Sequence, residues 1–395
     1  RRYVAELRPE NIGELAAMVA LFRPGPMEHI PRYIDVKFGK AEAHYPHEDL
    51  ANILDETNGV ITYQDQVLQI ARQFAGYTLG QADVMRKAMG KKIPEVMLQE
   101  RQGFIEGSIA QGYEKETAEI LFDLFEPFAG YAFNKAHAFS YATIAYQTAY
   151  LKAHYPLEYM TAVLMAAGGS QDRLAMAIRE CKRLNIEVLP PDINRSEANF
   201  CIDQQNDSFG IRFGLAQIKN VGDSGIKKLI DERKCDGDFL SIDDFVSRIN
   251  PRDVNKRVIE ALAKSGALDA FSERGKLIDG IDRLIQVAQE QFKIRETGQT
   301  SMFDLLEDEQ TLQAISLDSS EIIERQLLVW EKEYLGTYLS NHPFQEISSN
   351  VNQYVTTQMV DIDASRSGTE VVIAGWVTNV RSLVTRQNKQ FAIVT

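Results

Sequence analysis

The chain has 395 residues, of which 44% are hydrophobic and 25% are charged, as in an ordinary soluble globular protein. Its 43 Lys and Arg against 56 Asp and Glu give a formal net charge of −13, so any DNA contact must come from local basic segments rather than from the overall charge. Three cysteines without a CxxC pair argue against a zinc site and fit a cytoplasmic location, and no apolar run approaches the length that spans a membrane.

Helical periodicity dominates residues 1–205. A short apolar helix is expected over Glu14–Leu21, and the rigid turn Pro24-Gly25-Pro26 follows it. Pro94 is placed to open a later helix, and a long aromatic-rich helix is expected over residues 136–155. A further helix is marked by apolar residues at i, i+3, i+4 and i+7, namely Val67, Ile70, Ala71 and Phe74. In the long helix we expect core positions for the rings of Phe139, Tyr146 and Tyr150.

Two stretches of this half predict a site for a polyphosphate. The first is Arg86-Lys87-Ala88-Met89-Gly90-Lys91-Lys92, at the end of a helix that begins near Leu79, where Gly90 is expected to take the left-handed conformation that ends a helix. The second places Lys135 and His137 at the start of the long helix, and helix N-termini attract anions. The plain alternative for the first stretch is a solvated helix end whose cations match the helix dipole.

Beyond residue 205 the pattern changes to that of tandem helix-hairpin-helix motifs. Residues 214–226 carry Gly222 and Gly225 between apolar residues, and a helix is expected over Lys227–Arg233; a looser copy runs over residues 258–268. Hairpin glycines bring backbone N–H groups and a helix N-terminus close to a DNA phosphate. A glycine turn without a binding role is the alternative.

The last third contains a polar helix over Gln286–Arg295, a charged helix over Ile322–Tyr334 and a loop over Gly336–Phe344. Between the two helices, the apolar pair of Gln299-Thr300-Ser301-Met302-Phe303 lies in a polar stretch and is expected to need a partner surface, or else to pack on the same chain. Two strands are expected over residues 371–377 and 391–394, with a basic turn over Thr385–Lys389.

Four phrases in this order carry a family resemblance that extends over nearly the whole chain. They are Phe22-Arg23-Pro24-Gly25-Pro26-Met27, Tyr63-Gln64-Asp65-Gln66-Val67, Arg86-Lys87-Ala88-Met89-Gly90-Lys91-Lys92 and Phe133-Asn134-Lys135-Ala136-His137. This series resembles the fingers of the bacterial C-family replicative DNA polymerases, the alpha subunits of DNA polymerase III.

The resemblance implies a role for each candidate residue. Arg86, Lys135 and His137 would face the triphosphate of an incoming deoxynucleotide, and Lys135 or His137 is hypothesised to protonate the pyrophosphate. The remaining nucleotide-site candidates are Lys87, Lys91, Lys92, Arg23 and Asn134, with Gly25, Tyr63 and Gln64 beside the nascent base pair. The DNA-binding candidates are Gly222, Gly225, Lys219, Lys227, Lys264 and Gly266, and those that bind the sliding clamp are Gln299, Met302 and Phe303.

The implied fold class is mainly α, in a fragment of a longer chain. Its expected segments are fingers over residues 1–205, a tandem hairpin domain over 206–298, a clamp peptide over 299–303, a linker over 304–350 and the start of an OB-fold over 351–395. The implied partners are primer–template DNA, deoxynucleoside triphosphates, the sliding clamp and other replisome subunits, without a membrane. Mg²⁺ would be bound by palm carboxylates outside this fragment, which alone is expected to be inactive.

Other functions fit the residues less well. A non-catalytic DNA-binding scaffold explains the hairpins but leaves the four phrases unused. A P-loop ATPase fails because Gly39-Lys40, Gly90-Lys91 and Gly275-Lys276 lack the earlier glycine and the following Ser or Thr. His44 and His47 lack a third metal ligand, and the pair Asp361 and Asp363 is expected in a polar linker rather than in a metal site.

Overall fold

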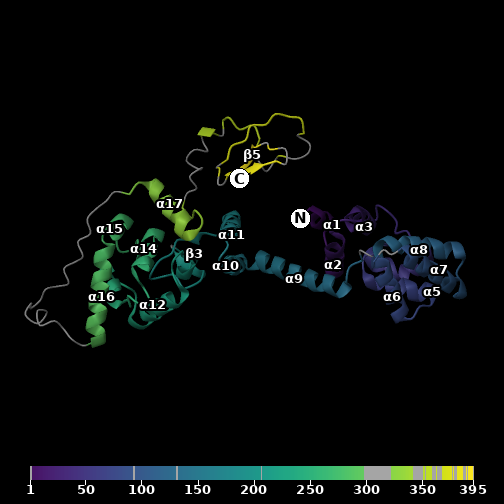
Figure 1. The fold of residues 1–395 in the computed structure, drawn as a ribbon, viewed down its shortest axis with the longest axis horizontal. Helices are drawn as coiled ribbons and strands as arrows, with labels where there is room; N and C mark the ends of the chain where they lie inside the picture. The colour runs from purple at the N-terminus through teal and green to yellow at the C-terminus, as the bar shows by residue number, and fades with distance from the viewer. Residues whose placement is uncertain are drawn as a thin grey trace, which may run out of the picture. The chain divides into compact units, whose positions relative to one another are not determined.

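The computed structural model describes residues 2–91, 94–129, 132–205, 207–297, 322–340, 350–351, 353–357, 362, 367–375, 377, 380–385, 388 and 390–394. Contacts divide the chain into two compact units, Arg1–His154 and Tyr155–Thr395. Helices are the main regular elements of both units, which confirms the mainly α fold class (Figure 1). None of the described helices combines the length and the apolar character needed to cross a bilayer.

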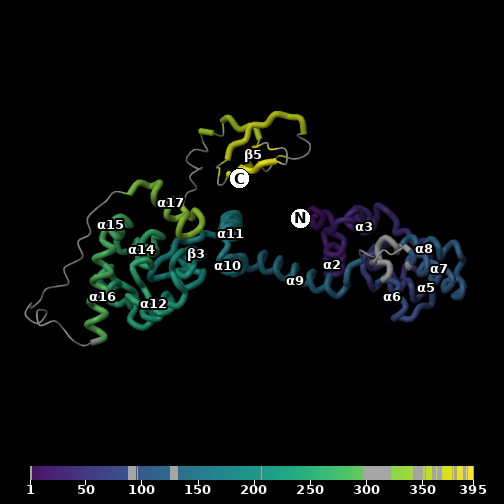
Figure 2. Tube along the Cα trace, in the orientation of Figure 1, coloured from purple at the N-terminus to yellow at the C-terminus, as the bar shows by residue number. Residues whose placement is uncertain are grey.

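In the described residues of the first unit the regular elements are all helices, apart from one isolated bridge. Its elements are α1 (Arg2–Leu7), α2 (Ile12–Leu21), η1 (Pro26–His29), α3 (Ile30–Lys37), η2 (Glu48–Leu50), α4 (Ala51–Leu54), η3 (Asp55–Thr57), α5 (Gln64–Ala75), α6 (Leu79–Lys91), α7 (Pro94–Ala110), α8 (Lys115–Ala129) and α9 (Lys135–His154). Figure 2 follows this order along the chain. The helices expected from Glu14, around Val67 and from Pro94 are therefore confirmed.

The main core of the first unit forms around α5. The four residues that share its predicted apolar face are buried and pack against α7 and α8: Val67, Ile70, Ala71 and Phe74. The approach of α7 is close, since a Cβ on Gly107 would lie 2.5 Å from the carbonyl oxygen of Ala75. Glycine is therefore required at this crossing.

A second, small-residue contact joins α2 to the start of α9. The side chains of Ala16 and Ala20 on α2 meet those of Ala138 and Ala142 on α9, and all four are buried. Small residues let the two helix backbones approach closely, so the position of the α9 N-terminus depends on α2.

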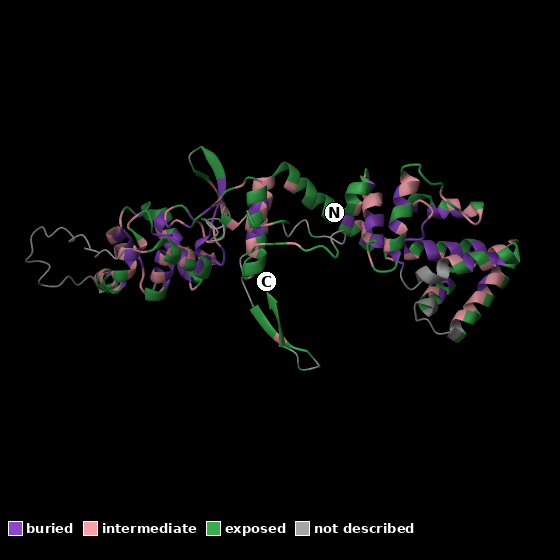
Figure 3. Ribbon diagram, turned by 90° about the horizontal axis from the view of Figure 1, so that it is seen from above, coloured by how far each residue is buried: buried purple, intermediate pink, exposed green. Residues whose placement is uncertain are grey.

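Two expectations for the first unit are wrong. Tyr146 and Tyr150 are 51% and 45% exposed instead of buried, because the ten-residue α2 covers only the first turns of the twenty-residue α9; Phe139 alone of the three expected rings packs there. Gly90 does not end its helix, because α6 continues through it to Lys91. Figure 3 shows the exposed surface of α9 in green.

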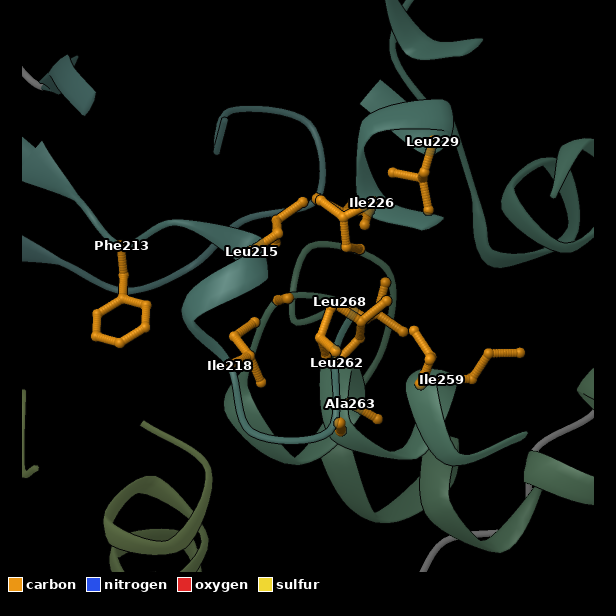
Figure 4. Packing of buried hydrophobic residues seen from close by; sticks show 14 of the residues in the cluster. Phe213, Leu215, Ile218, Ile226, Leu229, Ile259, Leu262, Ala263 and Leu268 are labelled. Carbon is orange, nitrogen blue, oxygen red and sulfur yellow. The ribbon is translucent and has the colours of Figure 1, made fainter. Parts of the chain in front are cut away.

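The second unit surrounds one large hydrophobic core. Its elements are α10 (Pro156–Ala166), α11 (Gln171–Arg183), β1 (Val188–Leu189), β2 (Cys201–Gln205), β3 (Ser208–Arg212), η4 (Leu215–Gln217), α12 (Asp223–Asp236), α13 (Ile242–Arg248), α14 (Lys256–Ser265), α15 (Arg274–Asp279), α16 (Ile281–Thr297), α17 (Glu324–Leu335), β4 (Val380–Val384) and β5 (Gln390–Val394). The expected helices over 286–295 and 322–334 correspond to α16 and α17. Figure 4 shows how the core brings Leu215, Ile226 and Leu262 together from three elements.

The three-stranded sheet of the second unit contains strands from both sides of the expected domain limit at residue 205. β3 pairs with β1 in parallel and with β2 in antiparallel register, so the strand order is β1-β3-β2. Met160 of α10 and Cys181 of α11 share the core with Phe213, just after β3. The compact units therefore divide at 154/155, and α10, α11 and the sheet belong with the hairpins.

The described C-terminal strands form a single hairpin, β4–β5, in which Val380 pairs with Val394. The turn expected over residues 385–389 lies between them, and Asn388 adopts φ 62° there. The expected first strand over 371–377 is wrong, since the described residues of that segment form no strand and β4 begins at Val380. Instead, the N–H of Val372 donates to the Thr356 hydroxyl at 2.8 Å.

A charge cluster fastens β2 to β3. Arg212 is only 3% exposed, and its guanidinium contacts the Asp203 carboxylate at 2.7 Å; Arg195 binds the same carboxylate at 2.6 Å. Hydrogen bonds from Arg195, and then from Arg212, hold the pKa of Asp203 below its ordinary value.

We expect Asp203→Asn to lower the free energy of unfolding of the second unit by about 2 kcal/mol, because it leaves the buried Arg212 cation without its counter-charge. The pKa of Asp203 is lower in the folded state, so this stabilisation is present above the unfolded pKa of about 4 and is lost as the pH falls through the folded value. Urea unfolding at pH 7 and at pH 3 measures the difference in the free energy of unfolding between the variant and the wild type. Asp231→Asn, an exposed position on α12, is the control and should change little; equal effects of both variants at pH 7 would contradict the assignment.

Candidate nucleotide and nucleic-acid binding sites

A two-residue backbone bridge assembles the candidate nucleotide site. The N–H of Gln64 donates to the Phe133 carbonyl at 2.9 Å, and the N–H of Phe133 donates to the Thr62 carbonyl at 3.0 Å, which makes a parallel bridge between Tyr63 and Phe133. The phrase at residues 63–67 is thereby joined to the phrase at residues 133–137. Their proximity, which the resemblance implied, is a feature of the fold.

The buried side chain of Gln66 fixes one side of this bridge. Its Oε1 accepts from the N–H groups of Thr62 at 2.8 Å and Tyr63 at 2.9 Å, and its Nε2 donates to the Ile53 carbonyl at 3.2 Å and the Thr57 hydroxyl at 2.7 Å. Gln66 is 1% exposed, and this amide uses its full hydrogen-bonding capacity. Its bond to the Tyr63 N–H is the one that the third residue of a helix makes in a capping box at the start of α5.

The first turn of α9 carries Asn134, Lys135 and His137. The Asn134 Oδ1 accepts from the His137 N–H at 2.9 Å, so Asn134 caps the helix. Lys135 Nζ donates to both carboxylate oxygens of Glu56, at 2.8 and 2.7 Å, and lies 5.7 Å from the centre of the Tyr63 ring and 5.9 Å from that of Phe139. Lys135 is therefore held between two rings and one carboxylate.

Aromatic contacts orient the other two charged or ionisable groups at this end of α9. The exposed imidazole of His137 lies 4.5 Å from the Tyr141 ring and 5.5 Å from the Phe133 ring, measured between centroids. The guanidinium of Arg23 stacks 4.7 Å from the Phe133 ring centre, and burial lowers the pKa of Arg23. The chain turns beside Arg23 through Gly25, whose φ of 97° favours glycine.

Burial also raises the pKa of the Tyr63 phenol, and the charge of Glu56 adds to this shift. The phenol is 2% exposed, within the cluster that joins α2 to α9. Tyr63 is thus a buried, neutral side chain next to the candidate site. Gln64, the next residue, is half-buried.

Arg86 and Lys87 form a separate group on α6 around Asp83. Arg86 donates to one Asp83 oxygen at 2.8 Å, and Lys87 contacts the other at 2.7 Å. Hydrogen bonds from Lys87 and Arg86 lower the pKa of Asp83. The described contacts join neither cation to the α9 group. The side chain of Lys91 and the whole of Lys92 lie outside the described residues.

The first hairpin leaves the N-terminus of α12 uncapped by any described side chain. Gly222 is the N-cap residue, and no described atom lies within 4 Å of where its Cβ would be, so a ligand can approach this backbone. Gly225 has a packing role instead, because its Cβ would lie 2.9 Å from the Asp253 carbonyl oxygen. Asn220 occupies the left-handed turn at φ 72°, and the Arg257 guanidinium donates to its side chain at 2.8 Å.

The lysines of the first hairpin are exposed, and each has an acidic neighbour. Lys219 lies 3.2 Å from Glu333, and Lys227 pairs with Asp223 one turn earlier on α12. Both lysine side chains remain more than half exposed, at 52% and 63%. They are accessible to an anionic ligand at the edge of the hairpin.

The second hairpin differs from the first, and its two candidate residues have structural contacts. Lys264 is paired with Glu260, and its ammonium lies 5.6 and 5.7 Å from the ring centres of Trp330 and Tyr334 on α17. Gly266 ends α14 at φ 89°, and its N–H bonds to the helix. The Lys264 side chain is thus largely covered, and the Gly266 N–H is used within the chain.

The predicted clamp site and the acidic pair rejected as a metal site both fall outside the described part of the chain. The clamp-binding residues Gln299, Met302 and Phe303 lie outside the described residues, as do Asp361 and Asp363. The part of the chain that the structure describes contains no group of three or more His, Cys, Asp or Glu side chains that could hold a metal ion. His47 instead caps η2, where its Nδ1 accepts from the Asp49 N–H at 3.2 Å.

The fold and its sites define a mainly helical protein with a helix-hairpin-helix region. The comparisons specify it further: a model described as the bacterial DNA polymerase III alpha subunit finger domain matches residues 1–112, and one described as the helix-hairpin-helix motif matches residues 185–277. Proteins named DNA polymerase III subunit alpha are similar over most of the chain.

The relative from Borreliella burgdorferi is 39% identical over 98% of this chain and 34% of its own length. The one from Thermus aquaticus is 43% identical over 86% of this chain and 28% of its own, and the one from Escherichia coli K12 is 37% identical over 99% and 34%. The chain belongs to the family of bacterial DNA polymerase III alpha subunits, and it spans about a third of the length of these relatives.

The structure adds residues that the sequence patterns did not single out. Gln66 was part of a quoted phrase, but its amide role depends on its contacts with Ile53 and Thr57 in the fold. Glu56, Asp83 and Arg257 were likewise not singled out. Their roles depend on contacts with residues brought near by the fold or by one helix turn.

We expect Gln66→Met to destabilise the first unit by about 3 kcal/mol, since an apolar side chain of similar size leaves two buried N–H groups and two acceptors without partners. Urea unfolding followed by circular dichroism measures the loss. Amide exchange at Thr62 and Tyr63 should accelerate as well. Gln69→Met, on the exposed side of the same helix, is the control. Equal stability of the two variants would show that the amide network does not hold the site.

Proposed function

We propose that this chain provides the incoming-nucleotide side and a DNA-backbone contact of a DNA-directed DNA polymerase, a nucleotidyltransferase of DNA replication. The observation that carries the proposal is the Tyr63–Phe133 bridge, which joins two of the family phrases and fixes Lys135 and His137 at one helix N-terminus. The family membership supports the same assignment.

The triphosphate would bind at the start of α9. Free N–H groups at a helix N-terminus attract phosphate, and the Lys135 ammonium lies on the same first turn. His137 and Arg23 flank the Phe133 ring next to it. Cations held in place before the reaction stabilise the charge that develops on the leaving pyrophosphate, which is the contribution proposed for this site.

The remaining nucleotide-site residues extend this arrangement. Gly25 and Gln64 border the bridge and would lie beside the nascent base pair, above the buried Tyr63. Arg86 and Lys87, with Lys91 and Lys92 beyond them, form the second basic group of the proposal. Arg86 and Lys87 would exchange Asp83 for phosphate oxygens on binding.

The first hairpin would grip the DNA backbone. The open N-terminus of α12 at Gly222 suits a phosphate, and Lys219, Lys227 and Arg257 are exposed cations near it. We leave Lys264 and Gly266 out of the DNA contact, because α17 and the helix cap occupy them. Their proposed role is to hold the second motif against α17.

The other parts of the proposal rest on the family alone. The peptide Gln299–Phe303 would bind the sliding clamp through Met302 and Phe303, and the C-terminal strands would begin an OB-fold. Mg²⁺ would be held by carboxylates of a palm domain, for which the described residues offer no matching cluster. We place the whole protein in the bacterial cytoplasm with other replisome subunits, and keep the family domain limits at residues 205, 298 and 350 as part of the proposal.

We expect Lys135→Ala to weaken the binding of a deoxynucleoside triphosphate by the 395-residue chain by at least tenfold, because a charge-assisted contact of about 1.5–3 kcal/mol is removed. Calorimetric or NMR titration measures the dissociation constant. Lys115→Ala, an exposed lysine of the same unit, serves as the control.

The same titration separates the polymerase proposal from a DNA-binding scaffold. A scaffold uses the hairpins alone, so the wild-type chain would bind duplex DNA and show no triphosphate binding. Triphosphate binding that is unchanged in Lys135→Ala would instead remove α9 from the site while leaving the family assignment intact.

For the hairpins, we expect Lys227→Ala to weaken duplex DNA binding and to reduce the slope of log K against log salt by about one, as for loss of one phosphate contact. Lys264→Met should leave that slope unchanged while it destabilises the contact of α14 with α17. Fluorescence anisotropy at several salt concentrations measures both. A slope reduced equally in the two variants would mean that both hairpins contact the backbone.

A further inference from the structure

Lys135 already binds an anion within the chain. Both Glu56 carboxylate oxygens accept hydrogen bonds from its ammonium, although 79 residues separate the two in sequence. The side chains are 36% and 45% exposed, so a ligand can reach the pair from solvent. Lys135 therefore has two alternative partners, the carboxylate of Glu56 and the phosphate of the proposed nucleotide.

The backbone around Glu56 is held independently of this ion pair. Glu56 is the middle residue of η3, and its neighbour Thr57 is fully buried and bonded to both Gln66 and the Leu54 carbonyl. On the other side, Asp55 accepts from the Tyr45 hydroxyl at 2.6 Å. When the ion pair opens, Glu56 consequently stays close enough to Lys135 to pair with it again.

The position of Lys135 favours a nearby anion. As the first residue of α9, it lies at the positive end of the helix dipole, where a cation is disfavoured. The carboxylate of Glu56 supplies one negative charge to offset this. A triphosphate brings several charges and oxygens, which can contact Lys135 and the free N–H groups of the first helix turn together.

We propose that Glu56 is a positioning residue that competes with the nucleotide's phosphates for Lys135. Binding would exchange the Glu56 contact for a phosphate contact, and Glu56 would recover Lys135 when pyrophosphate leaves. This inference rests on the proposed function of the α9 site. Its consequence is that Glu56 lowers triphosphate affinity and assists product release, while it keeps Lys135 oriented in the empty site.

The test is a double-mutant cycle on triphosphate binding by the 395-residue chain. Glu56→Gln should bind a deoxynucleoside triphosphate about two- to fivefold more tightly than the wild type, the range that one exposed ion pair contributes. In a Lys135→Ala background the same substitution should have no effect, because the competition acts through Lys135. A deoxynucleoside without phosphates should bind equally to the single variant and to the wild type.

Glu42→Gln is the matched control, since it removes one negative charge from an exposed position of the same unit. Equal affinities of Glu56→Gln and Glu42→Gln, or an effect of Glu56→Gln that persists without Lys135, would overturn the exchange while the nucleotide site stands. Absence of triphosphate binding in both the wild type and Glu56→Gln would overturn the proposed function as well.

If Glu56→Gln unfolds the chain, a second variant tests whether Glu56 competes with phosphate for Lys135. Glu56→Asp keeps the charge but shortens the side chain by one methylene, so it competes less well and should bind the triphosphate more tightly than the wild type does. Thermal unfolding verifies that it is folded. Affinity equal to that of the wild type would contradict the proposal.

Discussion

The candidate nucleotide site depends on one buried amide. Gln66 connects η3, the residues before α5 and the first turn of α5 through four hydrogen bonds in the core. The Tyr63–Phe133 bridge then extends this constraint to the start of α9. Because an unpaired polar group is costly in such an interior, this arrangement has few alternatives. The exposed charges of the site are thus positioned by polar contacts that solvent does not reach.

Several cations of the proposed binding sites pair with carboxylates of the same chain. Lys135 pairs with Glu56, Arg86 and Lys87 share Asp83, and the hairpin lysines also have acidic neighbours. These exposed pairs contribute little to stability. Under the proposed function, they would reduce the attraction of each group for other polyanions, and a ligand with several correctly placed charges would displace the carboxylates. The net charge of −13 is therefore compatible with the phosphate binding proposed for these groups.

Sequence periodicity predicted what depends on nearby residues and failed where distant packing decides. The predicted apolar face of α5, from Val67 to Phe74, is buried in the structure, because a repeated apolar spacing determines it. The helix end predicted at Gly90 was wrong because α6 packs against α5, α7 and α8. These contacts outweigh the weak helix propensity of one glycine. The core position predicted for the Tyr146 ring was wrong because the aromatic content of α9 does not indicate how far α2 extends along it. The partner Glu56 could not be predicted, since it reaches Lys135 only through the fold.

The two hairpins illustrate how similar patterns acquire different roles. Gly222 precedes a helix and faces open space, whereas Gly266 ends a helix and its N–H is used in the cap. A glycine in an apolar setting does not reveal which end of a helix it occupies, but only an N-terminus offers free donors to a phosphate. Residues just before and at the start of α14 contact the first hairpin: the Asp253 backbone packs against Gly225, its carboxylate pairs with Lys228, and Arg257 donates to Asn220.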